Sequence, residues 1–221
     1  MLGAILEVAH LIWFLYNRLV FILVNVYYYF LNEFDHTNHI RSCQTTLSLR
    51  IPKHIALAFT NEADNADLHS IAKLLCWCKQ LGIKNITIYD DRGKLKRNLK
   101  ALYKHLAYQM SLLGHEKPID RIEGLNVLSQ QDGRQKFVED VKSLLVESNE
   151  VDFKSVENCV GWPDDPELLI SFGSPICLYG FPPWQLRLTE IMSLPTHRNL
   201  PQRIFTDCLI RYSRITQRLG A

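Results

Sequence analysis

The sequence lacks an excess of charge of either sign. Lysine and arginine together number 25 and aspartate and glutamate 23, which gives a formal net charge of +2 at pH 7. A nearly neutral chain has no general electrostatic attraction for the phosphate backbone of nucleic acids. We therefore expect no nucleic-acid partner.

Paired cysteine and histidine motifs are also missing. The 6 cysteines show no repeated spacing, and the two closest, Cys76 and Cys78, are separated by one residue. That spacing fits neither a zinc site nor a thioredoxin-like motif, and the 8 histidines are scattered without ligand spacing. We expect no metal site formed by this chain alone, and small buried thiols in a reducing compartment.

A cleavable secretory leader is not indicated, because no basic start precedes the first apolar run and no small-residue cleavage site follows it. That run, LIWFLYNRLVFILVNVYYYF at residues 11–30, is about long enough to cross a bilayer. Its tyrosines suit a membrane interface, whereas Arg18 near its middle disfavours insertion. We expect residues 1–31 to anchor the chain in a membrane, with a buried or interfacial helix as the alternative. The basic residues that follow weakly favour a cytosolic C-terminal domain.

The remainder of the chain has the composition of a globular domain, since the whole sequence is 47% apolar and 22% charged. Residues 32–50 are polar and mixed, and we interpret them as a linker to a domain at 51–221. Buried strands are predicted at 54–59, 85–90, 124–129 and 166–171, and amphipathic helices at 65–82, 94–112 and 135–148. This alternation predicts an α/β fold with a central, largely parallel sheet flanked by helices.

Three details of these helices can be compared with a structure. Asp64 or Asn65 is expected to cap the first helix. The second is expected to run unbroken, with a lysine- and arginine-rich face that is either simply solvated or attracted to anionic lipid. The third is expected to turn its apolar residues inward. These are Phe137, Val138, Val141, Leu144 and Leu145.

The last helix is predicted to open near Asn199 and Pro201 and to carry a stripe of arginines beside an apolar face. Steps of 100° per residue place the four arginines within a narrow arc. They are Arg203, Arg211, Arg214 and Arg218. Guanidinium groups bind phosphate oxygens in a fork, but cations near a helix C-terminus also stabilise the helix dipole. Gly220 is likewise either an ordinary helix end or a point where a backbone N–H approaches a ligand.

Three motifs, in the same order along the chain, resemble the cis-prenyltransferase family. IPKHIALAFTNEAD (51–64) resembles the family's opening strand and diphosphate loop. DPELLISFG (165–173) is similar to its Asp-Pro-Asp-Leu motif, and LYGFPPWQLRLTEI (178–191) to its Trp-Gln segment and the Thr-Glu that follows. The resemblance covers residue 51 to the end and implies an undecaprenyl diphosphate synthase-like fold.

The departures from the family pattern lie at its diphosphate site. The aspartate that acts with Mg²⁺ falls at Thr60, which cannot supply a carboxylate to a hard cation. One arginine of the pattern falls at Asp64, where an anion repels diphosphate. Another arginine of the pattern falls at Ser171, which is neutral. The resemblance therefore implies that the chain has no complete catalytic site of its own and is not an active synthase by itself.

YDDRGKLKRN (89–98), PPWQLRLTEIMSLPTH (182–197) and the terminal QRLG resemble one branch of the family, the non-catalytic subunits of dehydrodolichyl diphosphate synthase. The branch implies a heterodimer with a catalytic cis-prenyltransferase at the endoplasmic reticulum membrane. That complex condenses isopentenyl diphosphate onto farnesyl diphosphate, to make long-chain polyprenyl diphosphate for dolichol synthesis and protein glycosylation. Mg²⁺ is then held mainly by the partner.

The same resemblance assigns roles to individual residues. Arg218, Leu219 and Gly220 are expected to complete the partner's isopentenyl-diphosphate site, with Arg211 and Arg214 as supporting cations. Three further residues are expected near the subunit interface. They are Trp184, Gln185 and Glu190, of which the first two are alternatively a packed corner. A different class of function, a membrane-anchored receptor or binding protein without an enzymatic partner, is the alternative.

Overall fold

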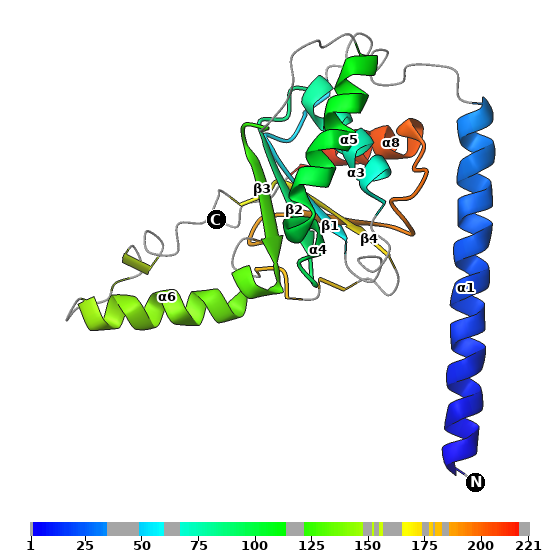
Figure 1. Cartoon of the computed structure of the whole chain (residues 1–221), viewed down its shortest axis with the longest axis horizontal. Coiled ribbons are helices and arrows are strands. Elements are labelled where there is room, and N and C mark those ends of the chain that lie inside the picture. Colours follow the sequence, from blue (N-terminus) through cyan, green and yellow to red (C-terminus); the bar gives the residue numbers. More distant parts are fainter. Residues whose placement is uncertain are drawn as a thin grey trace.

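A computed structural model of the protein describes the following residues: 2–34, 49–59, 67–113, 122–147, 152, 155–156, 165–173, 177–178, 180–182 and 186–216. It shows a long N-terminal helix, α1 (Leu2–Phe34), beside an α/β domain (Figure 1). Within α1, residues Ile5–Asn32 are long and apolar enough to cross a membrane. The predicted N-terminal helix is therefore present.

The domain is built on a five-stranded parallel sheet in the order β3-β2-β1-β4-β5. The strands are β1 (His54–Phe59), β2 (Asn85–Asp90), β3 (Leu125–Ser129), β4 (Leu168–Phe172) and β5 (Glu190–Leu194). Four of them confirm the predicted strands, and the parallel pairing confirms the predicted α/β architecture.

The fifth strand, β5, was not predicted. Its residues alternate between partly buried and exposed positions, because β5 is an edge strand that pairs with β4 on one side only among the described strands. Buried strands β1 and β4 give continuous apolar runs, whereas a half-exposed edge strand gives a weak signal.

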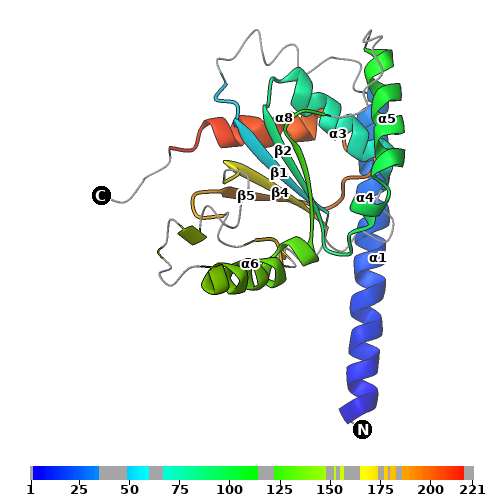
Figure 2. The ribbon, with the colours of Figure 1, turned by 60° about the vertical axis from the view of Figure 1, so that its left-hand side comes forward.

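Helices cover both faces of the sheet unequally (Figure 2). The helices are α3 (Leu68–Gln80), α4 (Lys94–Arg97), α5 (Leu99–Leu112), α6 (Arg134–Glu147) and α8 (Gln202–Ser213). One large core cluster joins Ile55, Leu57 and Phe59 of β1 to the buried faces of α3, α5 and α8. On the other face, Ala56 and Ala58 pack with Phe181 in a smaller cluster.

Two helix predictions were wrong in detail. Asp67, not Asp64 or Asn65, caps α3, because its carboxylate accepts the backbone N–H groups of His69 and Ser70. The helix predicted at 94–112 is interrupted at Asn98, which ends α4 and whose backbone carbonyl accepts the N–H groups of Ala101 and Leu102 in α5. Asparagine competes with helical hydrogen bonding and favours such breaks.

The outer helices also differ from prediction. In α6, Phe137, Val141 and Leu144 are partly buried, but Val138 and Leu145 are exposed, because α6 lies at the margin of the domain against the 3₁₀ turn η2 (Gln130–Asp132). Helix α8 ends at Ser213, so of the predicted stripe it carries Arg203 and Arg211, with Arg214 as its C-cap; Arg218 lies outside the described residues. The predicted apolar face of α8 is buried, however, through Phe205, Cys208, Leu209 and Tyr212.

The expectation of buried thiols holds for three cysteines. Cys76, Cys78 and Cys208 are free and buried, and burial raises the pKa of the first two to about 12 and of Cys208 to about 11. Cys177 is exposed, contrary to that expectation, because it lies in a surface segment outside the helices and strands. Cys43 and Cys159 lie outside the described residues.

Candidate functional site

The carboxyl edge of the parallel sheet is where open α/β folds bind ligands. In this chain the central strands reach that edge with Phe59 of β1 and Phe172 of β4, whose rings stack with centroids 5.1 Å apart. The His197 ring stands edge-on to Phe59, also at 5.1 Å, and all three side chains are buried. The described part of this edge is therefore closed by an aromatic cluster at the ends of β1 and β4.

His197 also connects this cluster to the start of α3. Its Nε2 accepts the backbone N–H of Asp67 at 3.0 Å, immediately after residues 60–66, which carry the predicted diphosphate-loop positions. Burial acts to raise the pKa of Asp67, but hydrogen bonds from the Ser70 hydroxyl and from the backbone of His69 and Ser70 outweigh it and lower that pKa. Both residues fix the point where the loop joins α3. Sequence reasoning missed His197, although it ends one of the motifs that resemble the family.

Acidic residues collect at the ends of β2 and β3. The carboxylate of Asp90 accepts the backbone N–H groups of Arg92 and Leu95, at 3.0 and 2.7 Å. Burial acts to raise the pKa of Asp132, but hydrogen bonds from Lys96 and Ser129 outweigh it, so this pKa is lowered. These carboxylates are thus used to hold α4 and η2 in place.

Asp91 differs from these two carboxylates. Its Oδ1 is buried and has no hydrogen-bond partner among the described residues. Burial, followed by the neighbouring Asp90 charge, raises the pKa of Asp91. The Asp91 side chain therefore resists ionisation, in contrast to Asp132, whose pKa is lowered.

The fold family implies Mg²⁺, so we compared the carboxylates at this edge with what the ion requires. Mg²⁺ takes oxygen ligands from carboxylates that are free to coordinate it. Asp90 and Asp132 are engaged by backbone and lysine donors, and within the described ranges no group of three or more His, Cys, Asp or Glu residues could hold a metal. The described residues do not fit a magnesium site.

Ser171, which the family resemblance aligns with an arginine, lies within β4 between Ala58 and Ser193 of the neighbouring strands. It is buried, and its hydroxyl has no hydrogen-bond partner within the described part of the chain. A short neutral side chain at this position provides no cation for a diphosphate.

Most of the predicted site residues lie outside the described residues. They are Thr60, Trp184, Gln185, Arg218, Leu219 and Gly220. Arg211 and Arg214 are described, and both are exposed at the C-terminal end of α8.

Arg50 contacts the C-terminal end of α8 and the residues just after it. The sequence analysis did not predict a role for Arg50. Its guanidinium lies 4.9 Å from the centroid of the Tyr212 ring and donates to the carbonyl of Ile215 at 3.5 Å. Arg50 thereby fixes the direction in which the chain leaves α8. A basic residue at the end of a predicted linker gave no signal of this contact.

The outer edge of β5 is one of the two edges of the described sheet, and β3 forms the other. Glu190, predicted near a subunit interface, opens β5, and its backbone N–H bonds to the carbonyl of Glu167. Beside it, Leu188 and Ile191 expose 57% and 46% of their surface. An edge strand with apolar side chains beside it is a natural surface for a protein partner.

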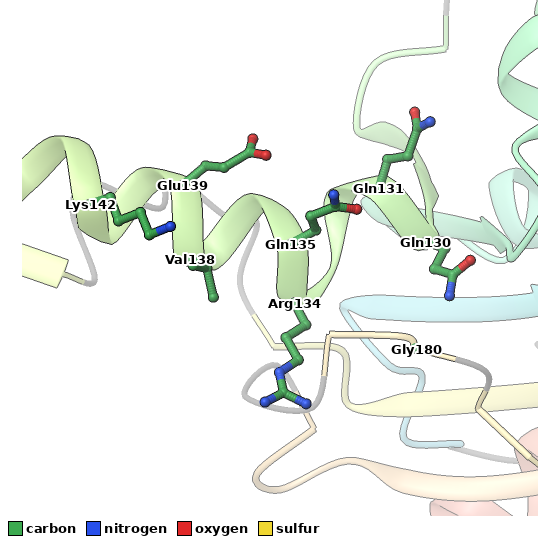
Figure 3. A pocket seen from close by; sticks show the side chains of 8 residues that line it. All are labelled: Gln130, Gln131, Arg134, Gln135, Val138, Glu139, Lys142 and Gly180. Carbon is green, nitrogen blue, oxygen red and sulfur yellow. The ribbon is translucent and has the colours of Figure 1, made fainter.

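A groove of about 680 Å³ lies between α6 and Gly180 (Figure 3). Arg134 and Val138 point to one side of α6 and Glu139 to the other, and Gln131 extends from η2, before α6 begins (Figure 3). The groove is open and its charges are mixed, so we assign it no ligand.

Comparison with known proteins identifies the family. No family model matches the chain. The dehydrodolichyl diphosphate synthase complex subunit Nus1 of Mus musculus is 33% identical over 198 residues, which cover 77% of this chain and 66% of that protein. The Homo sapiens subunit NUS1 is 31% identical over 198 residues, covering 77% and 67%. The chain belongs to the NUS1 family.

NUS1 relatives extend to fungi, where the Schizosaccharomyces pombe subunit is 28% identical over 201 residues, covering 76% of this chain and 77% of that protein. This chain spans about two thirds of the length of the mouse and human proteins.

Solved structures confirm the expected fold. A probable undecaprenyl diphosphate synthase from Campylobacter jejuni superposes with a TM-score of 0.59 at 17% identity, over 78% of this chain and 100% of that one. Lavandulyl diphosphate synthase from Lavandula x intermedia gives 0.55 at 16%, over 77% and 98%. At these identities the likeness establishes the fold alone.

Proposed function

We propose that this chain is the accessory subunit of a dehydrodolichyl diphosphate synthase complex. With a catalytic cis-prenyltransferase partner it supports condensation of isopentenyl diphosphate onto farnesyl diphosphate, giving long-chain polyprenyl diphosphate for dolichol synthesis and protein glycosylation. The main support for this proposal is that the chain belongs to a family of complex subunits. In addition, the carboxyl edge of its prenyltransferase-like sheet is closed by an aromatic cluster.

The partner supplies what this chain does not provide. Mg²⁺ and the catalytic carboxylate belong to the partner in this proposal, since Asp90 and Asp132 here are engaged in structural hydrogen bonds. Arg218 adds positive charge to the isopentenyl diphosphate, and Gly220 allows a backbone N–H to approach it closely. Arg211 and Arg214 support the same charge from the end of α8.

The edge of β5 is the surface we assign to the partner. Exposed Leu188 and Ile191 provide apolar contact, and Glu190, Trp184 and Gln185 belong to the same stretch of chain. Burial of these apolar side chains by a second subunit removes them from water.

We further propose that residues 1–31 anchor the protein in the endoplasmic reticulum membrane, that the part of 32–50 after the end of α1 at Phe34 forms a linker, and that the 51–221 domain lies in the cytosol. The support for anchoring is the long apolar helix α1, whose side chains are largely exposed over its first half.

Co-expression with a catalytic cis-prenyltransferase of the same organism tests the proposal. Membrane extracts are purified through a tag on this chain, and incorporation of labelled isopentenyl diphosphate with farnesyl diphosphate and Mg²⁺ is measured. We expect the pair to co-purify and to exceed either chain alone by at least about tenfold. Product from this chain alone, or no synthase in any preparation, contradicts the proposal, and the second result favours a receptor or binding protein.

A further inference from the structure

The two halves of α1 have different surroundings. In the C-terminal half, Val24 packs against the domain core, and Tyr28 belongs to that core with 3% of its surface exposed. In the N-terminal half, the apolar side chains are exposed, including Leu6, Ile12 and Tyr16. Figures 1 and 2 show the domain beside the C-terminal half only, while the N-terminal half extends beyond it. The C-terminal half of α1 is therefore packed, through Val24 and Tyr28, against the domain of the same chain.

A hydrogen bond fixes the C-terminal end of α1 to the turn that precedes α8. The side-chain amide of Asn32 donates to the backbone carbonyl of Asn199 at 2.7 Å. Asn199 has a φ of 48°, a left-handed conformation that few non-glycine residues adopt, and its own N–H donates to Ser70 Oγ of α3 at 3.2 Å. Asn199 thus joins α1 to α3.

The other two asparagines in α1 make no such link. Asn17 and Asn25 donate to carbonyls four residues earlier, those of Trp13 and Phe21, both at 2.8 Å. Each amide therefore has one N–H bonded within the helix, which suits an apolar environment. Along α1, the asparagine side chains therefore change between Asn25 and Asn32 from bonding within the helix to bonding with the domain.

Two arginines lie at the level where contact with the domain ends. The guanidinium of Arg198, from the same turn as Asn199, lies 5.9 Å from the Phe21 ring. Arg18 is about one helical turn before Phe21 and lies 5.7 Å from the Phe14 ring. Arginine is favoured at the headgroup layer, where its charge is hydrated and its stem contacts apolar groups.

We propose that the membrane boundary on α1 lies near Phe21, with residues 2–21 inserted and residues 24–32 docked on the domain. The inference rests on the proposed membrane anchoring. At about 1.5 Å per residue, twenty residues reach roughly 30 Å, the thickness of a bilayer core. Arg18 then lies about one turn from the headgroups instead of at the centre of the span.

The arrangement holds the domain directly against the bilayer instead of on a loose tether. Helix α6 runs across the direction of α1, on the side of the domain toward the free half of α1, in both views (Figures 1 and 2).

Cysteine accessibility in the full-length protein tests the boundary. Single cysteines replace Ile12, Val26 or Tyr29, which are all exposed, in a chain with Cys43, Cys159 and Cys177 changed to serine. The three buried thiols stay protonated near neutral pH. The protein is reconstituted in vesicles of phosphatidylcholine with about a quarter phosphatidylserine. A membrane-impermeant maleimide is then added on the side of the bilayer where the domain lies.

We expect positions 26 and 29 to react at least about tenfold faster than position 12. If positions 26 and 29 are as protected as 12, the span extends to residue 30, which overturns the boundary but leaves membrane anchoring intact. If all three react alike at the rate in detergent, both the boundary and anchoring fail. The co-expression assay measures the subunit role separately.

Adjacent tyrosines provide a matched control for docking. Tyr28 is 3% exposed and Tyr29 is 62% exposed. With a reporter cysteine at Val24, which is packed against the core, we expect Tyr28→Ala to raise its labelling rate by at least about tenfold and Tyr29→Ala to leave it unchanged. Equal rates in both variants would show that residues 24–32 are not docked.

Discussion

The imidazole Nε2 of His197 accepts the backbone N–H of Asp67 at 3.0 Å, and so joins the segment after β5 to the first turn of α3. The two residues are 130 positions apart in the sequence. Because His197 also packs edge-on against Phe59, this one side chain connects β1, α3 and the chain that leads to α8.

His197→Ala is expected to lower the free energy of unfolding by about 2–4 kcal/mol, because it leaves the Asp67 N–H without its acceptor and opens a cavity beside Phe59. Urea unfolding of the full chain in detergent, followed by tryptophan fluorescence, measures the change. His105→Ala is the control, since His105 is exposed on α5 and should change the stability by less than about 0.5 kcal/mol. Equal effects of the two substitutions would contradict the role of His197.

Asp91→Asn should stabilise the protein at pH 7. The folded-state pKa of Asp91 is raised by burial and by Asp90, so its ionisation disfavours the folded state above that pKa and has no effect below the unfolded value of about 3.9. After solvent screening we expect a gain below about 1 kcal/mol, which disappears as the pH falls to about 4.

Asp90→Asn is the contrasting variant for this experiment. Its carboxylate accepts two backbone N–H groups, so we expect a loss of about 1–3 kcal/mol at pH 7. Urea unfolding between pH 4 and 8 compares the two variants. A gain for Asp91→Asn that does not change with pH is incompatible with this explanation.

Ile191→Glu should weaken association with the catalytic partner at least about tenfold, because it places a charge at an apolar part of the β5 edge. Leu112→Glu, at an exposed apolar position on α5, is the matched control and should not affect association. Co-purification yield and the unfolding midpoint are measured for both. Normal association of the Ile191 variant would exclude this edge as the interface.

Arg218→Ala and Gly220→Ala should leave co-purification intact and reduce incorporation of isopentenyl diphosphate about 10- to 100-fold, as expected for the loss of one charge-assisted phosphate contact. Arg203→Ala, which removes an exposed arginine from α8, should retain activity. Unchanged turnover in both tail variants would eliminate the role of the C-terminus.

The three inner strands β1, β2 and β4 could be predicted from the sequence because they are buried and rich in apolar, β-branched or aromatic residues. Strand β3 was predicted from its short apolar run, although it is a partly buried edge strand. Helix α3 and the apolar face of α8 followed from helical periodicity. Edge strand β5 could not be found this way, since its partly buried positions alternate with exposed ones. The break at Asn98 was also missed, because the apolar periodicity continues across it.

Local sequence thus determined the secondary structure, the α/β class and, through three ordered motifs, the family resemblance. Only the tertiary structure decided that His197 joins the Asp67 cap of α3 to the sheet and that Asn32 fastens α1 to Asn199. The reason is physical: strand and helix patterns arise from neighbouring residues, whereas these contacts join segments more than a hundred positions apart and depend on how the chain folds back on itself.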